Sequence, residues 1–278
     1  MKASALGLFF LASGSAAAAQ EGSLPRHLRD RGTGVPTSMF GTYVRQGELL
    51  VYPFFEYYID NDLEYKPSEL GYGLDVDFRG RYRASEGLIF LAWGLGRNFA
   101  VEIEAAVITA RLEKSPSDTS AMPASVEESG LGDVEGQLRW RFMEERGRRP
   151  EGFAYFETVF PLQKQRRLIG TSDWEWKLGF GLTRGWGFGT MTFRLGIEYD
   201  RAERKFDAGE YAIEYLRQVS NRFRGFAVIE GNQLDEVALI IGGQWRLAPR
   251  LTFKFNNGFG LTPNATDIAP EIGLMFSF

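Results

Sequence analysis

The last nine residues, PEIGLMFSF at positions 270–278, alternate between two kinds of side chain. One face carries only apolar side chains: Ile272, Leu274, Phe276 and Phe278. The other face carries Glu271, Gly273, Met275 and Ser277. A period of two predicts a β-strand with unlike surroundings on its two sides. A closing strand that is apolar on one face and ends on an aromatic residue is typical of an outer-membrane barrel, because it must pair with the first strand and face lipid.

The N-terminal stretch has the three parts of a secretory signal peptide. Lys2 gives a basic start, an apolar run covers 5–11, and small residues cover 16–19, where we place the cleavage site. The apolar run is too short to span a bilayer. We therefore assign residues 1–19 to a signal peptide. The chain has no cysteine, which suits an oxidising compartment and excludes a lipoprotein anchor.

The composition favours a barrel over a helical membrane protein. Of the 278 residues, 44% are hydrophobic, 14% are aromatic and 33 are glycines. After the signal peptide, no apolar run reaches the roughly 18 residues of a spanning helix. Richness in aromatic residues and glycine suits strands that alternate between lipid and lumen. A secreted soluble β-protein is the alternative.

Alternating segments predict an all-β, antiparallel, up-and-down transmembrane β-barrel. We place twelve strands at residues 48–58, 86–96, 100–112, 131–142, 153–160, 173–183, 190–200, 209–217, 222–231, 236–247, 251–260 and 270–278. The even count agrees with single-chain bacterial barrels. Residues 20–46 are interpreted as an irregular N-terminal segment, and residues 47–278 as the barrel.

Residues 59–82 form the longest connection and are predicted to be an extracellular loop. Within it, Leu74, Val76 and Phe78 alternate with charged residues, which indicates a strand that extends beyond the membrane. Both termini are expected on the periplasmic side, because the longer connections of such barrels lie outside the cell.

Two segments resemble one bacterial family. SGLGDVEGQLRWRF at 129–142 resembles the Gly-Leu-Gly-Asp strand opening of outer-membrane transporters associated with the meta-cleavage pathway of phenol degradation. GLGRNFAVEIEA at 94–105 is similar to a turn and strand of the same family. The resemblance covers the barrel from about residue 83 onward. It implies a transporter-like barrel.

Charged side chains on the inward faces are predicted to line the lumen. The acidic set is Glu102, Glu104, Asp133, Glu135, Glu175, Glu198 and Glu214, with further acids near the outer mouth at Asp173, Asp200, Glu210, Glu230, Glu236 and Glu271. The basic set is Arg139, Arg141, Arg194, Arg222, Arg224, Arg246 and Lys254. This placement predicts that the charge lining the lumen changes from acidic near the outer mouth to basic near the periplasmic mouth.

Glu102 and Glu104 interrupt this order at the base of their strand. They lie within reach of Arg139 and Arg141 on the next strand, so we expect cross-strand ion pairs there. Two interpretations of the lumen charges are open. They form either a structural network of carboxylate–guanidinium pairs that fills the barrel or the lining of an open, selective passage.

The first two strands are apolar on both faces. Their residues Tyr52, Phe54, Leu88 and Phe90 are assigned to the lumen side, where an apolar surface needs an apolar partner. One hypothesis is a plug formed by residues 20–46. Its apolar side chains would be Leu24, Leu28, Val35, Met39 and Phe40. The other hypothesis is an apolar track for a hydrophobic substrate, and the two hypotheses are compatible.

The expected partners follow from the barrel. They are outer-membrane lipid and lipopolysaccharide around girdles of aromatic residues, the barrel-assembly machinery through the C-terminal strand, and a small hydrophobic substrate. We expect a monomer. The formal charge of −4 argues against nucleic acid.

No catalytic or metal site is predicted. Histidine-based hydrolysis needs a Ser–His pair, and the only histidine, His27, precedes the first strand. One histidine, no cysteine and dispersed carboxylates predict no metal site, and no cofactor is expected.

We therefore predict a passive outer-membrane channel for small hydrophobic or aromatic compounds, located in the outer membrane of a Gram-negative bacterium. A closed structural or surface-interaction barrel without transport is the alternative. An outer-membrane enzyme is a third candidate.

Overall fold

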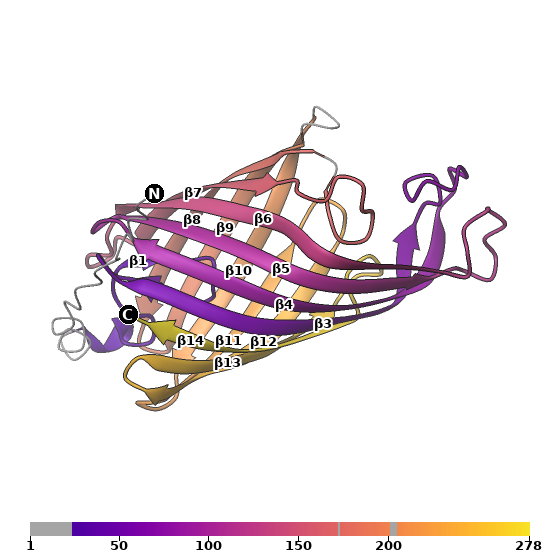
Figure 1. Cartoon of the computed structure of the whole chain (residues 1–278). Helices are drawn as coiled ribbons and strands as arrows, with labels where there is room; N and C mark the ends of the chain where they lie inside the picture. The colour runs from indigo at the N-terminus through magenta and orange to yellow at the C-terminus, as the bar shows by residue number, and fades with distance from the viewer. Residues whose placement is uncertain (1–23, 172, 201–204) are drawn as a thin grey trace, which may run out of the picture.

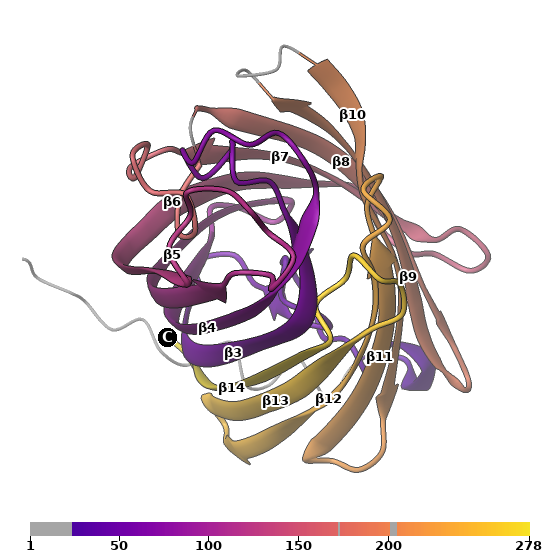
Figure 2. The same ribbon diagram turned by 90° about the vertical axis from the view of Figure 1, so that its right-hand side faces the viewer.

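The structure is a closed barrel of antiparallel strands (Figures 1 and 2). The computed structural model describes residues 24–171, 173–200 and 205–278, and the predicted signal peptide lies outside them. Within this part of the chain, the twelve strands of the barrel are β3 (Leu49–Tyr65), β4 (Phe78–Gly94), β5 (Phe99–Glu113), β6 (Ser125–Met143), β7 (Glu151–Phe160), β8 (Glu175–Trp186), β9 (Gly189–Asp200), β10 (Lys205–Gln218), β11 (Phe223–Gly231), β12 (Val237–Ala248), β13 (Leu251–Gly260) and β14 (Ile268–Ser277). None of the described helices is long and apolar enough to cross a membrane.

The ring closes between its first and last strands. β14 pairs with β3 in antiparallel register, which places Ile272 opposite Phe55. At the end of this seam, Leu49 and Phe278 exchange two backbone hydrogen bonds of 2.9 and 3.2 Å. The predicted twelve-stranded, up-and-down barrel is confirmed. Closure gives every strand of the ring a hydrogen-bonded neighbour on both sides.

The barrel is apolar outside and polar inside. At mid-strand, the outward side chains of Leu195 and Ile241 are 47% and 52% exposed. The inward charged residues Arg139, Lys254 and Glu102 are only 1–2% exposed. Soluble proteins show the reverse distribution. The outer face is therefore matched to hydrocarbon, and ionised groups are kept in the lumen.

The wall is taller on one side. β3–β6 hold 15–19 residues each, whereas β7–β14 hold 9–14. The four long strands therefore project beyond the rim on the right of Figure 1. Strands β3 and β4 continue into the predicted extracellular segment 59–82, so the connection between them covers only 66–77, and Leu74 and Val76 lie in this connection rather than in a strand. Tyr65, Leu112 and Met122 form a buried cluster on the projection, which stabilises these strand ends outside the barrel.

The described part of the N-terminal segment is more regular than predicted. It contains the 3₁₀ helix η2 (Arg26–Leu28) and a hairpin of β1 (Val35–Pro36) and β2 (Tyr43–Val44). Gly34 has φ 108°, and a Cβ there would lie 2.2 Å from the Val44 carbonyl oxygen, so the hairpin requires glycine at this position. We call residues 24–46 the plug. It lies inside the end of the barrel at which the chain ends, which we call the plug end (Figure 1).

The inside-out distribution predicts how the wall responds to charge. In protein refolded into lipid vesicles, we expect Ile241→Arg at mid-strand to lower the free energy of unfolding by about 2–4 kcal/mol, because the guanidinium must enter hydrocarbon. The matched control is Thr109→Arg, on the outer face near the projecting end of β5, where the cost is at most about 1 kcal/mol. Equal costs at the two sites, measured by urea titration, would contradict a lipid-facing exterior.

Candidate functional site

The apolar side of the plug covers the apolar inner face of β3 and β4. Val35 and Val44 are fully buried, and Met39 packs beside them. Their partners include all four residues predicted to form an apolar track: Tyr52, Phe54, Leu88 and Phe90. The structure thus brings the plug residues Val35 and Met39 together with the apolar stripe of the wall.

Phe40 contacts a different part of the wall. It lies in the loop of the hairpin and packs against a buried cluster on β10 and β11, with its ring centroid 5.9 Å from that of Phe226. The Arg194 guanidinium lies 5.4 Å from the centre of the same ring. The plug therefore spans the lumen from the β3–β4 wall to the β10–β11 wall. Leu24 and Leu28 lie outside these buried clusters.

One edge of the plug is held by β5 and β6. The Ser38 backbone amide and hydroxyl donate to Glu102 Oε2 at 3.1 and 2.8 Å. Arg139 Nη1 donates to the Pro36 carbonyl at 3.0 Å, and its Nε lies 3.4 Å from Glu102 Oε1. The predicted Glu102–Arg139 ion pair is therefore present, and the pair also holds the plug.

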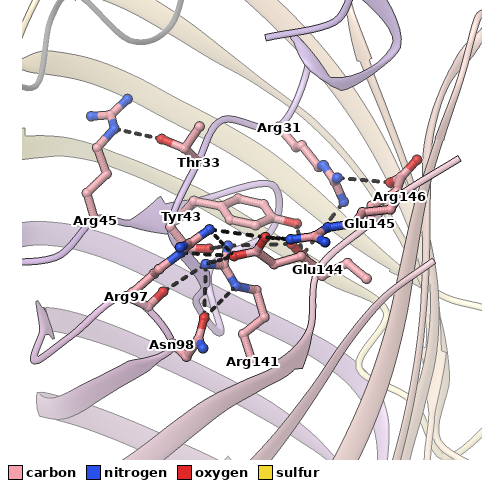
Figure 3. Close-up of polar contacts among 12 residues, drawn as sticks. Arg31, Thr33, Tyr43, Arg45, Arg97, Asn98, Arg141, Glu144, Glu145 and Arg146 are labelled. Atoms are coloured by element: carbon pink, nitrogen blue, oxygen red, sulfur yellow. Dashed lines mark hydrogen bonds and ion pairs between the residues drawn. The ribbon is translucent and has the colours of Figure 1, made fainter. Parts of the chain in front are cut away.

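A second group of contacts joins the plug to the turn and strand that follow β6. Arg31 pairs with Glu145 at 2.9 Å and lies 3.6 Å from Glu151. The Tyr43 hydroxyl donates to Glu151 Oε1 at 2.8 Å. Figure 3 shows Arg31, Tyr43 and Glu145 converging beside Arg141 of β6. These five residues come from two segments that are far apart in sequence, 31–43 and 141–151, and meet at the plug end.

Arg141 does not pair with Glu104 as predicted. It donates to the Gly34 carbonyl of the plug and lies 3.8 Å from Glu151. The register of β5 and β6 places Glu104 opposite Glu135 instead. The expectation of a second ion pair here is wrong, because the register places Trp140 opposite Phe99, so that Arg141 lies beyond the start of β5 and away from Glu104.

The opposite edge of the plug is held by β9, β11 and β12. Thr190 donates to Asp30 Oδ1 at 2.6 Å. Burial raises the pKa of the Asp30 carboxyl, and the Thr190 hydrogen bond opposes this rise. Gln244 donates to the Phe40 carbonyl at 2.6 Å, and Arg224 to the Gly41 carbonyl at 3.4 Å. The plug is thus fixed on both sides of the lumen.

A cavity of about 250 Å³ lies beside the plug tip, deeper in the lumen. Met39, Phe40, Phe90 and Tyr155 give it apolar surface. The described acids that line it are Glu102, Glu104, Glu135, Glu157, Glu210 and Glu230, and the bases are Arg139, Lys177 and Arg194. Acids therefore outnumber bases around this space by two to one.

The bases of this cavity are already paired. Lys177 lies 3.0 Å from Glu157 and 2.7 Å from Glu210. Arg194 pairs with Glu214 at 2.7 Å and reaches Glu230 at 3.9 Å. Each base here therefore lies beside a carboxylate. The predicted charge gradient along the whole lumen stays a prediction.

Two of the acids are left facing each other. Glu104 and Glu135 are directly opposite across β5 and β6, and no hydrogen bond or ion pair joins either one to another side chain in the described part of the chain. Like charges in this position repel. They are the least compensated groups of the cavity.

The remaining predicted lumen residues lie elsewhere. Lys254 is buried with its Nζ 4.7 Å from the Tyr52 ring centre, and Glu271 accepts from the Tyr52 hydroxyl. Glu198 of β9 lies opposite Lys177 of β8. Glu175 is two residues before Lys177, at the start of β8. Arg246 lies opposite Thr252 near the plug end. The side chain of Asp200 falls outside the described part of the chain.

Asp133 binds a loop. It lies where the register of β5 and β6 shifts. Its carboxylate accepts from the Leu162 and Gln163 amides at 2.7 and 3.3 Å and from the Thr171 hydroxyl at 2.7 Å. Ile169 of the same loop is buried against Ala84 and Ala110 on the inner face of the wall. The loop therefore folds over the mouth opposite the plug, and Asp133 anchors it.

Sequence reasoning missed several residues of this site. Glu157 and Tyr155 lie on β7, where aromatic residues occupy both faces, so alternation could not assign the inward face. Lys177 could have been found, because it shares a face with the predicted Glu175. Arg31, Glu145 and Glu151 carried no local signal, since they meet only after folding.

His27 lies in η2 at the plug end. Its Nε2 is 3.9 Å from Glu145 Oε1, and its side chain is 45% exposed. Among the described residues, no group of three or more histidines and carboxylates has the arrangement of a metal site.

Comparison with solved structures identifies the architecture. No family model and no curated protein matches the chain. An outer membrane channel from Pseudomonas putida F1 is similar over 88% of this chain and 100% of that chain, with a TM-score of 0.61 and 13% sequence identity. The translocator domain of the autotransporter NalP from Neisseria meningitidis is similar over 84% and 89%, with a TM-score of 0.54 and 10% identity. The chain has the fold of outer-membrane β-barrels.

The buried plug contacts predict a loss of stability on neutralising Glu151. Glu151→Gln removes the charge that faces Arg31 and Arg141, and we expect it to lower the free energy of unfolding by about 2–3 kcal/mol. The control Glu113→Gln breaks the exposed pair with Arg81 and should cost at most about 1 kcal/mol. Urea titration in lipid vesicles measures both. A Glu151 variant as stable as the control would show that these contacts do not stabilise the barrel.

Proposed function

We propose that the chain is an outer-membrane channel that admits small hydrophobic or aromatic compounds by passive diffusion, with the plug controlling the periplasmic end. The proposal includes the predicted surroundings: outer-membrane lipid, lipopolysaccharide at the projecting end, and insertion through β14 by the assembly machinery, as a monomer. The similar protein from Pseudomonas putida F1 is described as an outer membrane channel, which supports this assignment.

The observation that carries the proposal is the continuity of the apolar stripe. Phe90 belongs to the buried cluster beneath the plug and also lines the cavity beyond the plug tip, and Met39 contacts both regions. A displaced hairpin would therefore uncover apolar surface from the plug end to the cavity. A polar solute gains little from such a surface, whereas an apolar one can exchange water for it.

A closed structural barrel is the second candidate. It is favoured by the buried charged residues that hold the plug on both edges, with Arg31–Glu145 on one edge and Asp30–Thr190 on the other. No observation favours the third candidate, an enzyme. The position of the plug during solute exposure separates the first two candidates.

Removing the hairpin should increase conduction. We expect a variant with residues 34–45 replaced by a glycine–serine linker to raise the swelling rate of liposomes in a neutral aromatic solute such as benzyl alcohol several-fold. The control replaces residues 66–77, a connection of the same length on the projection, and should behave as the parent protein. If the parent protein conducts nothing and the hairpin variant conducts no more, the closed barrel is correct.

The excess of carboxylates in the cavity should make the unplugged channel prefer cations, as rings of acidic side chains do in other pores. In planar bilayers under a salt gradient, the reversal potential of the hairpin variant should indicate cation selectivity. Adding Glu104→Gln and Glu135→Gln should lower the cation-to-anion permeability ratio at least two-fold. Glu113→Gln with Glu127→Gln, outside the lumen on the projection, should leave the ratio unchanged. An anion-selective channel would contradict this assignment of charge.

A further inference from the structure

The loop between β7 and β8 forms a compact flap at the mouth opposite the plug. We call its residues 162–171 the lid. The two ends of the lid lie close together, because a Cβ at Gly170 would lie only 2.6 Å from the Cβ of Gln163. The Arg166 amide donates to the Gln163 carbonyl at 2.7 Å and closes a turn within it. A surface loop whose ends adjoin packs as one unit, so the lid is a single body attached at its base.

Two carboxylates of β6 hold the lid. Asp133 accepts hydrogen bonds from both ends, from the amides of 162–163 and from the amide and hydroxyl of Thr171. Glu128 Oε2 accepts from the amides of 167–168, at 2.9 Å each. Hydrogen bonds from backbone amides to carboxylates are charge-assisted and stronger than neutral ones. The lid is therefore latched to β6 at its base and in its middle.

The underside of the lid is apolar. Ile169 is 4% exposed and is buried against Ala84 of β4 and Ala110 of β5, on the inner face of the wall. Leu168 packs on the same cluster. Ile108 of β5 packs on this cluster and also on the cluster beneath the plug. The apolar stripe of the wall therefore continues from the plug to the lid.

The apolar surface also continues outward from the lid. Leu168 and Tyr82 pack both on the cluster beneath the lid and on the cluster of Tyr65, Leu112 and Met122 on the projection. The lid thus lies where the apolar surface of the projection meets that of the lumen. An apolar molecule that leaves water at the projection meets the lid before it reaches the stripe.

We propose that the lid is the outer gate of the apolar stripe, with Asp133 and Glu128 as its latches. This inference rests on the proposed function, because it names a second gate of the same channel. Displacement of the lid removes Ile169 from the wall and uncovers Ala84 and Ala110. An apolar solute that takes the place of Ile169 offsets this loss of burial, so it favours the open lid, whereas a polar solute does not.

Access to the covered wall tests the lid without a measurement of conduction. The chain has no cysteine, so Ala110→Cys gives a single thiol beneath the lid, opposite Glu128 across β5 and β6. In nanodiscs of phosphatidylcholine, we expect D133A/E128A to raise its rate of labelling by N-phenylmaleimide at least ten-fold. The control E113A/E127A removes two carboxylates from the outer face of the same two strands and should leave the rate unchanged.

A second thiol guards against disturbance of the lid by the first. Ala84→Cys on β4 should show the same ten-fold increase with D133A/E128A. Heat-modifiable migration on gels verifies that each variant is folded, and D133A and E128A are measured singly if the pair does not fold. Labelling that is no faster in the latch variants than in the control at both thiols overturns the lid.

Liposome swelling separates this inference from the proposed function. In the variant with residues 34–45 replaced, D133A/E128A should raise the swelling rate in benzyl alcohol at least a further two-fold, because the two gates act in series. If labelling rises as expected and no variant conducts, the lid covers the stripe of a closed barrel and the proposed function is wrong. If the hairpin variant conducts but D133A/E128A labels or conducts no faster than its control, the channel stands and the outer gate is wrong.

Discussion

Every backbone amide of the wall needs a partner in the neighbouring strand, and the β14–β3 seam completes this requirement. Hydrocarbon offers no hydrogen bonds, and an unpaired amide in it costs several kcal/mol. The seam at Leu49 and Phe278 therefore determines more than one strand pairing. It converts a sheet into a cylinder with a fixed strand number, and a cylinder of this size has a lumen that side chains and a short segment of chain can fill.

In the lumen, charged side chains pack closely against aromatic rings. Phe153 and Tyr155 point inward from β7 and lie against β8 where it has glycines; a Cβ at Gly181 or Gly179 would lie 2.0 Å from their rings. The Arg139 guanidinium lies 5.4 and 5.0 Å from the centres of these two rings. The glycines of β8 make room for the two rings, and the paired Arg139 packs on them, so that these groups form one packed layer. The plug is attached to this layer through the Pro36 carbonyl.

Two cavities of opposite charge flank the tip of the plug. The larger one is rich in carboxylates and continues the apolar stripe that begins at Tyr52, whereas the smaller one is rich in arginine. The hairpin lies between these environments, with residues 38–40 lining the acidic cavity and residues 41–43 lining the basic one. A small movement of the hairpin would therefore change the apolar, acidic and basic surfaces together. In the proposed channel, the plug is therefore the element that would control the lumen.

The sequence by itself determined the wall. Alternation in segments such as 270–278 and 131–142 is a local property, because successive side chains of a strand point to opposite faces, and it predicted twelve strands and the lumen face of Arg139 and Glu102. The resemblance at 129–142 pointed to the same architecture. Alternation failed where both faces are aromatic, as at Tyr155, and where strands continue beyond the membrane, as at Tyr65.

Only the tertiary structure decided what fills the barrel. The contacts of Arg31 with Glu151, of Ser38 with Glu102 and of Arg141 with Gly34 join residues far apart in the chain. No periodicity encodes them, because the plug has no repeat and its position depends on the closed wall around it. The position of Glu104 opposite Glu135 rather than opposite an arginine likewise followed from the strand register. Local patterns specify which face a side chain takes, and closure of the barrel specifies which side chains meet.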